Sequence, residues 1–339
     1  MKITRALTVV ALVVSITSCT KSVSDSPTTD ATLQLDATPK EVTLLAYDAF
    51  TPVDGIFDTF TKATGATVKV VTGGDTGTLV SKAILTAGNP EADVLWGLDN
   101  TFLSRAQKAD LLTSYEPVDY GDICVNYDKA WFTKKNIPVP ASFEDLALPA
   151  YKNLLAVQDA VASSTGLGFV LGTIAHFGTD KWQEYWKSLM ANGTHVSADW
   201  TTAYTIDFSG SSGKGKYPLV VSYGSSPPAE VVYSESPISE PPTGVIESTC
   251  FRQTEYVGSL RGAKNPKLAA LLISYLLDTS FQESMPLSLF VFPVNKKAVL
   301  PEIFRSFAVT PATPLEVEPA EIEKNRETWL DQWRDIAIG

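Results

Sequence analysis

The chain has 339 residues and a formal net charge of −11 at pH 7. Its length allows about two domains, and 44% hydrophobic with 19% charged residues is typical of a folded globular protein rather than a disordered one. The acidic balance argues against a nucleic-acid partner, whose phosphates are also negative. Two histidines and three cysteines leave little material for a zinc or haem site, so we expect no metal or cofactor.

The first residues have the pattern of an export signal. Lys2 and Arg5 precede an apolar run over residues 7–16, which is too short for a membrane-spanning helix of about 20 residues. Small residues then lead to Cys19, as in bacterial lipoprotein signals. We therefore expect residues 1–18 to be a lipoprotein signal peptide and Cys19 to carry lipid. An ordinary secretory signal cut nearby is the alternative. The mature protein would be exported and held by its lipid anchor alone at the outer face of the cytoplasmic membrane.

Residues 19–40 are rich in Ser, Thr, Asp and Pro and lack a periodic apolar face. This composition predicts a flexible tether, with folded structure from Glu41. The next segments alternate strands and helices: strands over 41–46, 67–71 and 93–97, and helices over 56–64 and 78–87. This β-α-β-α-β order favours a doubly wound parallel sheet, with ligand groups at the carboxyl ends of its strands.

The second half of the sequence contains two long strand candidates, residues 118–127 and 247–258. We also expect a strand over 217–222, helices near 138–148 and over 266–279, and a terminal helix over about 318–336. The terminal helix has a buried stripe of Ile322, Trp329, Trp333 and Ile336. If the two long strands cross between two lobes, they form a hinge. The predicted units are then lobe 1 (residues 41–123 and 256–311), lobe 2 (124–255) and a C-terminal helical segment (312–339) packed across both.

Cys124 and Cys250 lie one in each long strand candidate. If those strands are neighbours, the two sulfurs are placed for a disulfide, which an exported protein permits. The competing interpretation is a free nucleophilic thiol in the ligand cleft.

Aromatic, hydroxyl and acidic residues gather at the ends of the predicted elements. Aromatic faces sandwich flat rings and attract cations, and hydroxyls with amides at helix N-termini bind anionic oxygens. Asp48 or Asp99 is placed to neutralise a positive charge. Singly, each residue is more often part of a core or a turn, but together they suit a small aromatic cation that carries oxygens or phosphate. The group comprises Tyr47, residues 75–78, Trp96 with 97–100, residues 163–166, Trp200, Tyr204 and residues 222–227.

From Glu41 onward the chain resembles the periplasmic thiamine-binding proteins of ABC importers, which are group II solute-binding proteins. The matching pieces are Tyr47-Asp48-Ala49-Phe50, Ala92-Asp93-Val94 with Gly97-Leu98-Asp99-Asn100, Asp119-Tyr120-Gly121, Tyr127-Asp128-Lys129, Gly166-Leu167-Gly168, Trp200 with Ala203-Tyr204, Val221-Ser222-Tyr223 with Ser225-Ser226-Pro227, Phe292-Pro293-Val294, and Trp329 with Trp333. The resemblance implies an α/β, two-lobed periplasmic-binding-protein-like II fold. Each lobe would be a mixed sheet flanked by helices, with the ligand in the cleft between them.

The resemblance also implies binding without chemistry. A monomer would capture thiamine or one of its phosphates and deliver it to the permease and its ATPase. The family's ligand contacts fall on Asp75 and Thr76 for phosphate, the hydroxyl pair Ser163 and Ser164, the stacking Trp200, Tyr47, and the turn Tyr223, Gly224, Ser225, Ser226 and Pro227. Two positions depart from the pattern. Pro228 and Ala229 stand where a second tyrosine is expected, and Phe290 replaces a tryptophan.

Three alternatives remain open at the level of sequence. An iron-binding protein of this fold would typically use adjacent tyrosines, and the chain has no Tyr-Tyr pair. A polyamine-binding protein would use aromatics and acids but would not need the hydroxyl and amide cluster. A thiaminase I-like enzyme would use Cys124 as its nucleophile, which a disulfide with Cys250 would prevent.

Overall fold

The computed structural model describes residues 41–212 and 214–339, so the predicted signal peptide, Cys19 and the tether lie outside it. Within these ranges no helix has the length and apolar character needed to cross a membrane. The elements are β1 (Glu41–Ala46), α1 (Asp58–Thr64), β2 (Thr67–Thr72), α2 (Thr76–Leu85), β3 (Val94–Asp99), α3 (Leu103–Lys108), β4 (Leu112–Asp128), α4 (Lys129–Lys135), α5 (Phe143–Leu146), η1 (Pro149–Tyr151), β5 (Leu155–Gln158), α6 (Ser164–Phe177), α7 (Trp182–Ala191), β6 (His195–Ser197), η2 (Thr202–Asp207), α8 (Ser209–Ser212), β7 (Leu219–Tyr223), α9 (Pro227–Val232), β8 (Thr243–Leu260), α10 (Pro266–Leu276), α11 (Thr279–Ser288), β9 (Phe292–Pro293), α12 (Glu302–Phe307) and α13 (Pro319–Ala337).

The strands form one mixed sheet in the order β2-β1-β3-β8-β4-β7-β5-β6, with β9 paired to β4. Strands β1, β2 and β3 are parallel, as the sequence predicts, and β5 is parallel to β6 and β7. The sheet as a whole is not of the parallel type, because β8 runs antiparallel to both β3 and β4. The α/β class is therefore confirmed, and the two parallel sets of strands are joined by long antiparallel ones.

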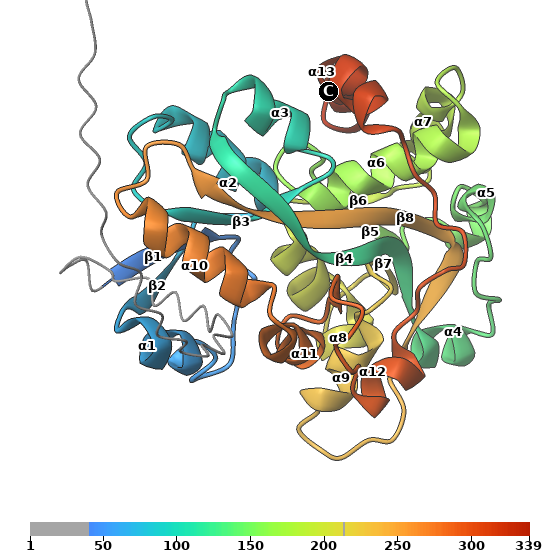
Figure 1. Ribbon diagram of the computed structural model, residues 1–339. Helices are drawn as coiled ribbons and strands as arrows, with labels where there is room; N and C mark the ends of the chain where they lie inside the picture. Colours follow the sequence, from blue (N-terminus) through green and yellow to red (C-terminus); the bar gives the residue numbers. More distant parts are fainter. Residues whose placement is uncertain (1–40, 213) are drawn as a thin grey trace, which may run out of the picture. The chain divides into compact units, whose positions relative to one another are not determined.

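The two long strand candidates are neighbours in the middle of the sheet (Figure 1). Strand β4 pairs with β8 along almost its whole length, from Leu112 opposite Leu260 to Asp128 opposite Thr243. Because β8 also pairs with β3, and β4 with β7, this pair connects the two parallel sets of strands. The pairing is interrupted by three irregularities, where the partner shifts along the strand.

A disulfide joins Cys124 of β4 to Cys250 of β8, as predicted from the two strands. Both residues are buried. Beside the disulfide the register shifts, and the Val125 N–H donates to the Thr249 hydroxyl at 2.9 Å instead of to a backbone carbonyl. The covalent bond and this hydrogen bond together fix the register of β8 against β4 at the irregularity.

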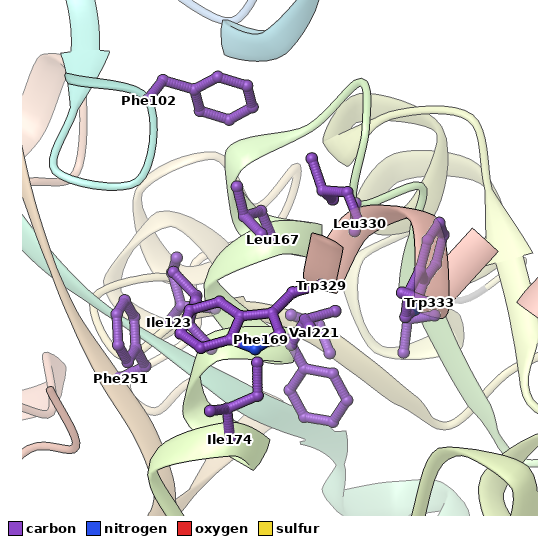
Figure 2. Close-up of a cluster of buried hydrophobic side chains, with 14 of the residues drawn as sticks. Phe102, Ile123, Leu167, Phe169, Ile174, Val221, Phe251, Trp329, Leu330 and Trp333 are labelled. Atoms are coloured by element: carbon purple, nitrogen blue, oxygen red, sulfur yellow. The ribbon is translucent and has the colours of Figure 1, made fainter. Parts of the chain in front are cut away.

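A large buried cluster of apolar side chains packs the helices onto the sheet. Figure 2 shows part of it, with side chains from β4, α6, β7, β8 and α13. In the terminal helix Ile322, Trp329 and Trp333 are buried, as predicted, and Ile336 packs against the same cluster at its edge. The ring of Trp333 meets that of Trp186 in α7 edge to face, with centroids 5.8 Å apart.

Helix α13 also contacts the segment before α3, through the buried side chain of Arg326. Its guanidinium lies over the Phe102 ring, 4.3 Å from the centroid, and its Nε donates to the Thr101 carbonyl at 3.2 Å. Helix α13 therefore contacts α7 on one side and the start of α3 on the other.

Replacing both Cys124 and Cys250 by serine should lower the free energy of unfolding by about 2–5 kcal/mol, because the bond closes a long loop in the unfolded chain. The sequence separation of the two cysteines is 126. Denaturant unfolding of the double variant against the parent measures the loss. As a control, thiol titration of denatured, unreduced parent protein lacking Cys19 should find no reactive thiol. Two titratable thiols would contradict the pairing.

Candidate functional site

The amino ends of α2 and α6 meet, and their polar side chains contact one another. Asp75 caps α2, and its carboxylate accepts the N–H of Thr76 at 2.7 Å. The Ser164 hydroxyl, at the first position of α6, donates to the Thr76 hydroxyl at 3.3 Å. The approach is close because Gly77 lacks a side chain: a Cβ there would lie 2.4 Å from the Val161 carbonyl oxygen. The structure thus brings together the predicted phosphate contacts Asp75, Thr76, Ser163 and Ser164.

Asp75 also joins two distant parts of the chain. Its second carboxylate oxygen accepts the backbone N–H of Trp200 at 3.1 Å. Burial raises the pKa of Asp75, while hydrogen bonds from Ser163, Thr76 and Trp200 hold it down in part. The segment before η2 is therefore tied to the start of α2.

Four aromatic side chains lie near this junction. The Trp200 ring stacks on that of Tyr204, with centroids 5.2 Å apart and an interplanar angle of 10°. Its Nε1 donates to the Ser222 hydroxyl at 3.0 Å, and the Tyr223 ring is tilted toward it at 6.4 Å. The Tyr47 ring packs against Gly97, where a Cβ would lie 2.3 Å from Tyr47 Cδ1. Trp200, Tyr223 and Tyr47 are half-buried, so each retains accessible surface.

The predicted turn after β7 is held by its own hydroxyls. Ser222 and Ser226 share a hydrogen bond at 2.8 Å, and Ser226 also accepts the Tyr223 N–H at 3.2 Å. Pro227 takes the first position of α9. Because Ser222 also accepts from Trp200, the turn positions the indole and Tyr223 relative to each other.

Gly224 and Ser225 bond to backbone groups. The Gly224 N–H donates to the Asp122 carbonyl at 2.7 Å, and its own carbonyl accepts the Val309 N–H at 2.8 Å. A Cβ at Gly224 would lie 2.3 Å from the Val309 carbonyl oxygen, so only glycine fits this approach. The Ser225 hydroxyl donates to the Phe290 carbonyl at 2.6 Å. That these two residues contact ligand stays a prediction.

Phe290 has a left-handed backbone with φ of 54°. Its ring meets Tyr233 edge to face, at 5.5 Å between centroids. Tyr233 lies at the end of α9 and is 66% exposed. The sequence analysis did not select Tyr233, although it is the first tyrosine after the position where the family pattern expects one.

Three acidic residues occupy the same level of three neighbouring strands. Glu255 of β8 is opposite Asp99 of β3 on one side and Asp119 of β4 on the other. Asp99 and Asp119 have no exposed surface, and Glu255 is 4% exposed. Like charges directly opposite each other in a sheet repel, so three ionised carboxylates here would destabilise the fold.

The three carboxylates differ in their hydrogen bonds. Asp99 is well supplied: it accepts from the N–H and hydroxyl of Thr101, at 2.8 and 2.6 Å, and from the Gln253 amide. Asp119 accepts from the Trp96 Nε1 at 3.1 Å through Oδ2. Its Oδ1 and the Oε2 of Glu255 are buried and have no partner among the described residues. Asp99, the predicted charge-neutralising residue, is thus bonded within the protein, whereas Asp119 and Glu255 each keep an unused acceptor.

The burial of several carboxyl groups close together raises their pKa values. Burial raises the pKa of Asp119 to about 8, and the charge of Asp99 adds to this effect. The hydrogen bond from the Trp96 N–H lowers the same pKa in part. Burial raises the pKa of Glu255 well above its usual range, and Asp119 and Asp99 add to the effect. The pKa values of Tyr47 and Tyr223 are also raised, by burial and next by the charge of Glu255.

The sequence analysis missed Asp119 and Glu255 as site residues. Each is an acidic residue inside a long strand candidate, but the same strands contain other charged residues, such as Asp122 and Arg252, so the sequence does not single out this pair. In the described ranges no set of three or more His, Cys, Asp or Glu side chains is arranged to hold a metal ion.

Comparison with known proteins gives consistent matches. The model of a family described as bacterial extracellular solute-binding protein matches residues 89–306. The thiamine-binding periplasmic protein of Salmonella typhimurium is 27% identical over 315 residues, covering 86% of this chain and 92% of the relative. That of Brucella abortus is 25% identical over 320 residues, covering 86% and 91%. A solved periplasmic thiamin binding protein has a TM-score of 0.78 and 25% identity, covering 88% of this chain and 96% of that one. The two-lobed periplasmic-binding fold predicted from the sequence is thereby confirmed.

The raised carboxyl pKa values make a prediction about stability. A carboxyl whose pKa is higher in the folded protein than in the unfolded chain keeps its proton in the fold, so stability falls as the pH rises through about 8. Asp119→Asn removes this ionisation. Its melting temperature should exceed that of the parent near about pH 8 and approach it near about pH 5. Glu91→Gln, which removes an exposed carboxylate, is the control. A parent melting temperature that does not fall over this range would contradict the assignment.

Proposed function

This chain belongs to the bacterial extracellular solute-binding protein family, and from this premise we propose that it binds thiamine or a thiamine phosphate between its two lobes and delivers it to the permease of an ABC importer. The protein acts as a carrier, and no bond of the ligand is made or broken. The ligand assignment draws on the relatives named for thiamine and on the side chains of the candidate site. In this proposal, lobe 1 comprises residues 41–123 and 256–311, and lobe 2 comprises residues 124–255. The C-terminal segment, residues 312–339, packs across both lobes.

The main support for this proposal is that half-buried aromatic rings and buried carboxylates lie together in the candidate site. Trp200, Tyr223 and Tyr47 come from three separate segments. The Tyr223 ring packs against Gly121, two residues from Asp119 on β4, and the Tyr47 ring packs against Gly97, two residues from Asp99 on β3. Thiamine has a flat pyrimidine and a cationic thiazolium ring. Aromatic faces attract both, the second through cation–π contact as well as dispersion. In this proposal Tyr204 supports one face of Trp200, and the ligand ring stacks on the other.

A phosphate group on the ligand would be held at the amino ends of α2 and α6. Helix amino ends carry the positive end of the helix dipole, and both helices are long enough for this effect. Thr76, Ser163 and Ser164 supply hydroxyls there. In the ligand-bound protein these hydroxyls exchange their mutual hydrogen bonds for bonds to phosphate oxygens, with Asp75 orienting the Trp200 segment.

The other ligand classes are less well supported. The disulfide occupies Cys124, so the thiaminase alternative has no free nucleophile there. Several iron-binding proteins share the fold at lower identity; iron-bound HitA of Pseudomonas aeruginosa, for example, is 19% identical with a TM-score of 0.69, which is a likeness of fold alone. A polyamine would use the acids and rings but would leave the hydroxyls of α2 and α6 without a role.

Isothermal titration of the purified protein tests the ligand class directly. Thiamine, its monophosphate and its diphosphate are compared with Fe³⁺ and spermidine under identical conditions. We expect a dissociation constant between about nanomolar and micromolar for at least one thiamine compound. Tight binding of Fe³⁺ or spermidine, with none of the thiamine compounds bound, would overturn the proposal.

Trp200→Ala should weaken thiamine binding by about one to two decades in Kd, because a stacked ring contributes about 1–3 kcal/mol. Thiamine should quench tryptophan fluorescence in the parent, and most of this quench should be lost in the variant. Trp131→Phe on α4 removes another half-buried tryptophan and should leave both affinity and quench unchanged. Unchanged affinity in a folded Trp200→Ala protein would exclude Trp200 as a stacking residue.

We further propose that the protein is exported as a lipoprotein anchored through Cys19. This rests on the pattern of residues 1–19 and on the periplasmic location in the names of the relatives. Cys19→Ala should leave the precursor unprocessed or release the protein into the soluble fraction, as fractionation and mass spectrometry would show. A variant that remains normally cleaved and membrane-bound would exclude lipid at this residue.

A further inference from the structure

Asp119 and Glu255 form a carboxylate pair that the hydrogen bonds of the protein leave unsatisfied. They are opposite each other on β4 and β8, and each has a buried oxygen without a partner among the described residues. The Trp96 N–H is the one donor shown for the Asp119 carboxylate, and it also acts on the pKa of Glu255. Buried carboxylates are normally satisfied by several donors or by a positive charge. This pair is therefore built for a partner from outside the chain.

The charged groups that act on the pKa values of the pair are acidic, which favours a cation as its partner. Asp99 of β3 acts on both carboxylates, and Asp75 of α2 acts on Glu255. The remaining titratable neighbours are Tyr47, which follows β1, and Tyr223 at the end of β7. Their raised pKa values keep the phenols neutral.

The cation is an aromatic ring rather than a metal ion. Within residues 41–212 and 214–339 no cluster of three or more His, Cys, Asp or Glu is arranged to hold a metal. Instead, the Tyr223 ring packs against Gly121, two residues from Asp119 on β4. A delocalised positive ring can contact a phenol face and a carboxylate edge at once.

We propose that Asp119 and Glu255 are the charge-selecting residues of the site: they contact the thiazolium ring of thiamine, and the pair gives up one proton when that ring binds. The inference rests on the proposed function and assigns a role to two residues on the hinge strands. Charge balances, since one proton leaves to solvent as one positive ring enters. Asp99, already bonded to Thr101 and Gln253, orients the site.

The direction of the pH effect follows from the free protein. The pKa of Asp119 is raised to about 8, so near neutral pH the pair holds a proton. A bound cation stabilises the ionised form and lowers this pKa. Binding is therefore linked to proton release, and affinity should rise with pH up to about 8, by at most about tenfold per pH unit for one proton.

The first test compares thiamine with 3-deazathiamine, in which a neutral thiophene ring replaces the thiazolium. Parent protein should bind thiamine at least about tenfold more tightly, since a buried charge pair is worth at least that much. Glu255→Gln and Asp119→Asn should each weaken thiamine at least about tenfold, leave 3-deazathiamine unchanged or tighter, and flatten the pH dependence. Glu91→Gln carries the same change in net charge on an exposed residue and should match the parent. Thermal melts establish that each variant is folded.

The second test needs no variant. Titration calorimetry of parent protein with thiamine, in two buffers of different ionisation enthalpy near about pH 7, counts the protons released, and close to one is expected. Thiamine itself is used because its phosphates titrate in this range.

The outcomes separate the two proposals. Failure of the parent to bind either ring compound would overturn the proposed function, and this inference with it. Equal affinity of the parent for both compounds, no proton release, or a folded Glu255→Gln protein with parental discrimination would each overturn the inference while leaving thiamine binding intact.

Discussion

The antiparallel register of β4 and β8 is the constraint on which the rest of the structure depends. It decides that Glu255 stands opposite Asp119, and through β3 it brings in Asp99 at the same level. A slip of one residue would turn Glu255 to the other face of the sheet, and a slip of two would move it away from Asp119. The disulfide between Cys124 and Cys250 blocks both, because it fixes β8 against β4 at a point where regular ladder bonds are interrupted.

The acidic residues at this level of the sheet destabilise the fold, although they suit a site for a charged ligand. A sheet centre is where a protein best buries apolar side chains, yet here it holds three acids. Their repulsion and desolvation are offset by the large apolar cluster that packs the helices onto the sheet, to which Trp333, Trp186 and several α6 side chains belong. Sites that bind charged ligands commonly keep such locally unfavourable groups, and the fold supplies the stability elsewhere.

The sequence predicted the elements with strong local signals. The alternation of Glu41–Ala46, the Gly65 stop after α1, and the stripe through Trp329 and Trp333 each have a short-range physical cause, and the structure bears out each of them. Short strands such as β5 and β6 were missed because three or four residues carry too little periodicity. The π-helical turn η2, which places Tyr204 under Trp200, has no recognised sequence signal.

The sequence predicted many of the residues that make up the candidate site, but it did not predict how they are arranged. Asp75, Thr76, Ser163 and Ser164 were expected together because the family resemblance assigns all four to the ligand, and the contacts between the amino ends of α2 and α6 agree. The pairing of Asp119 with Glu255 depends on a register between strands more than a hundred residues apart, which no local pattern encodes. Asp99 accepts hydrogen bonds from Thr101 and Gln253 in the structure, and its role in neutralising a ligand charge stays a prediction.

The hydrogen bond from Trp96 to Asp119 has an optical consequence. On excitation, an indole moves electron density from its five-membered ring toward its six-membered ring, so a negative charge beside the N–H lowers the energy of the excited state. Trp96 is fully buried, and its N–H points at a carboxylate that holds or lacks a proton according to pH. Its emission therefore shifts to longer wavelength as Asp119 ionises. The protein therefore carries its own spectroscopic indicator of the charge on Asp119.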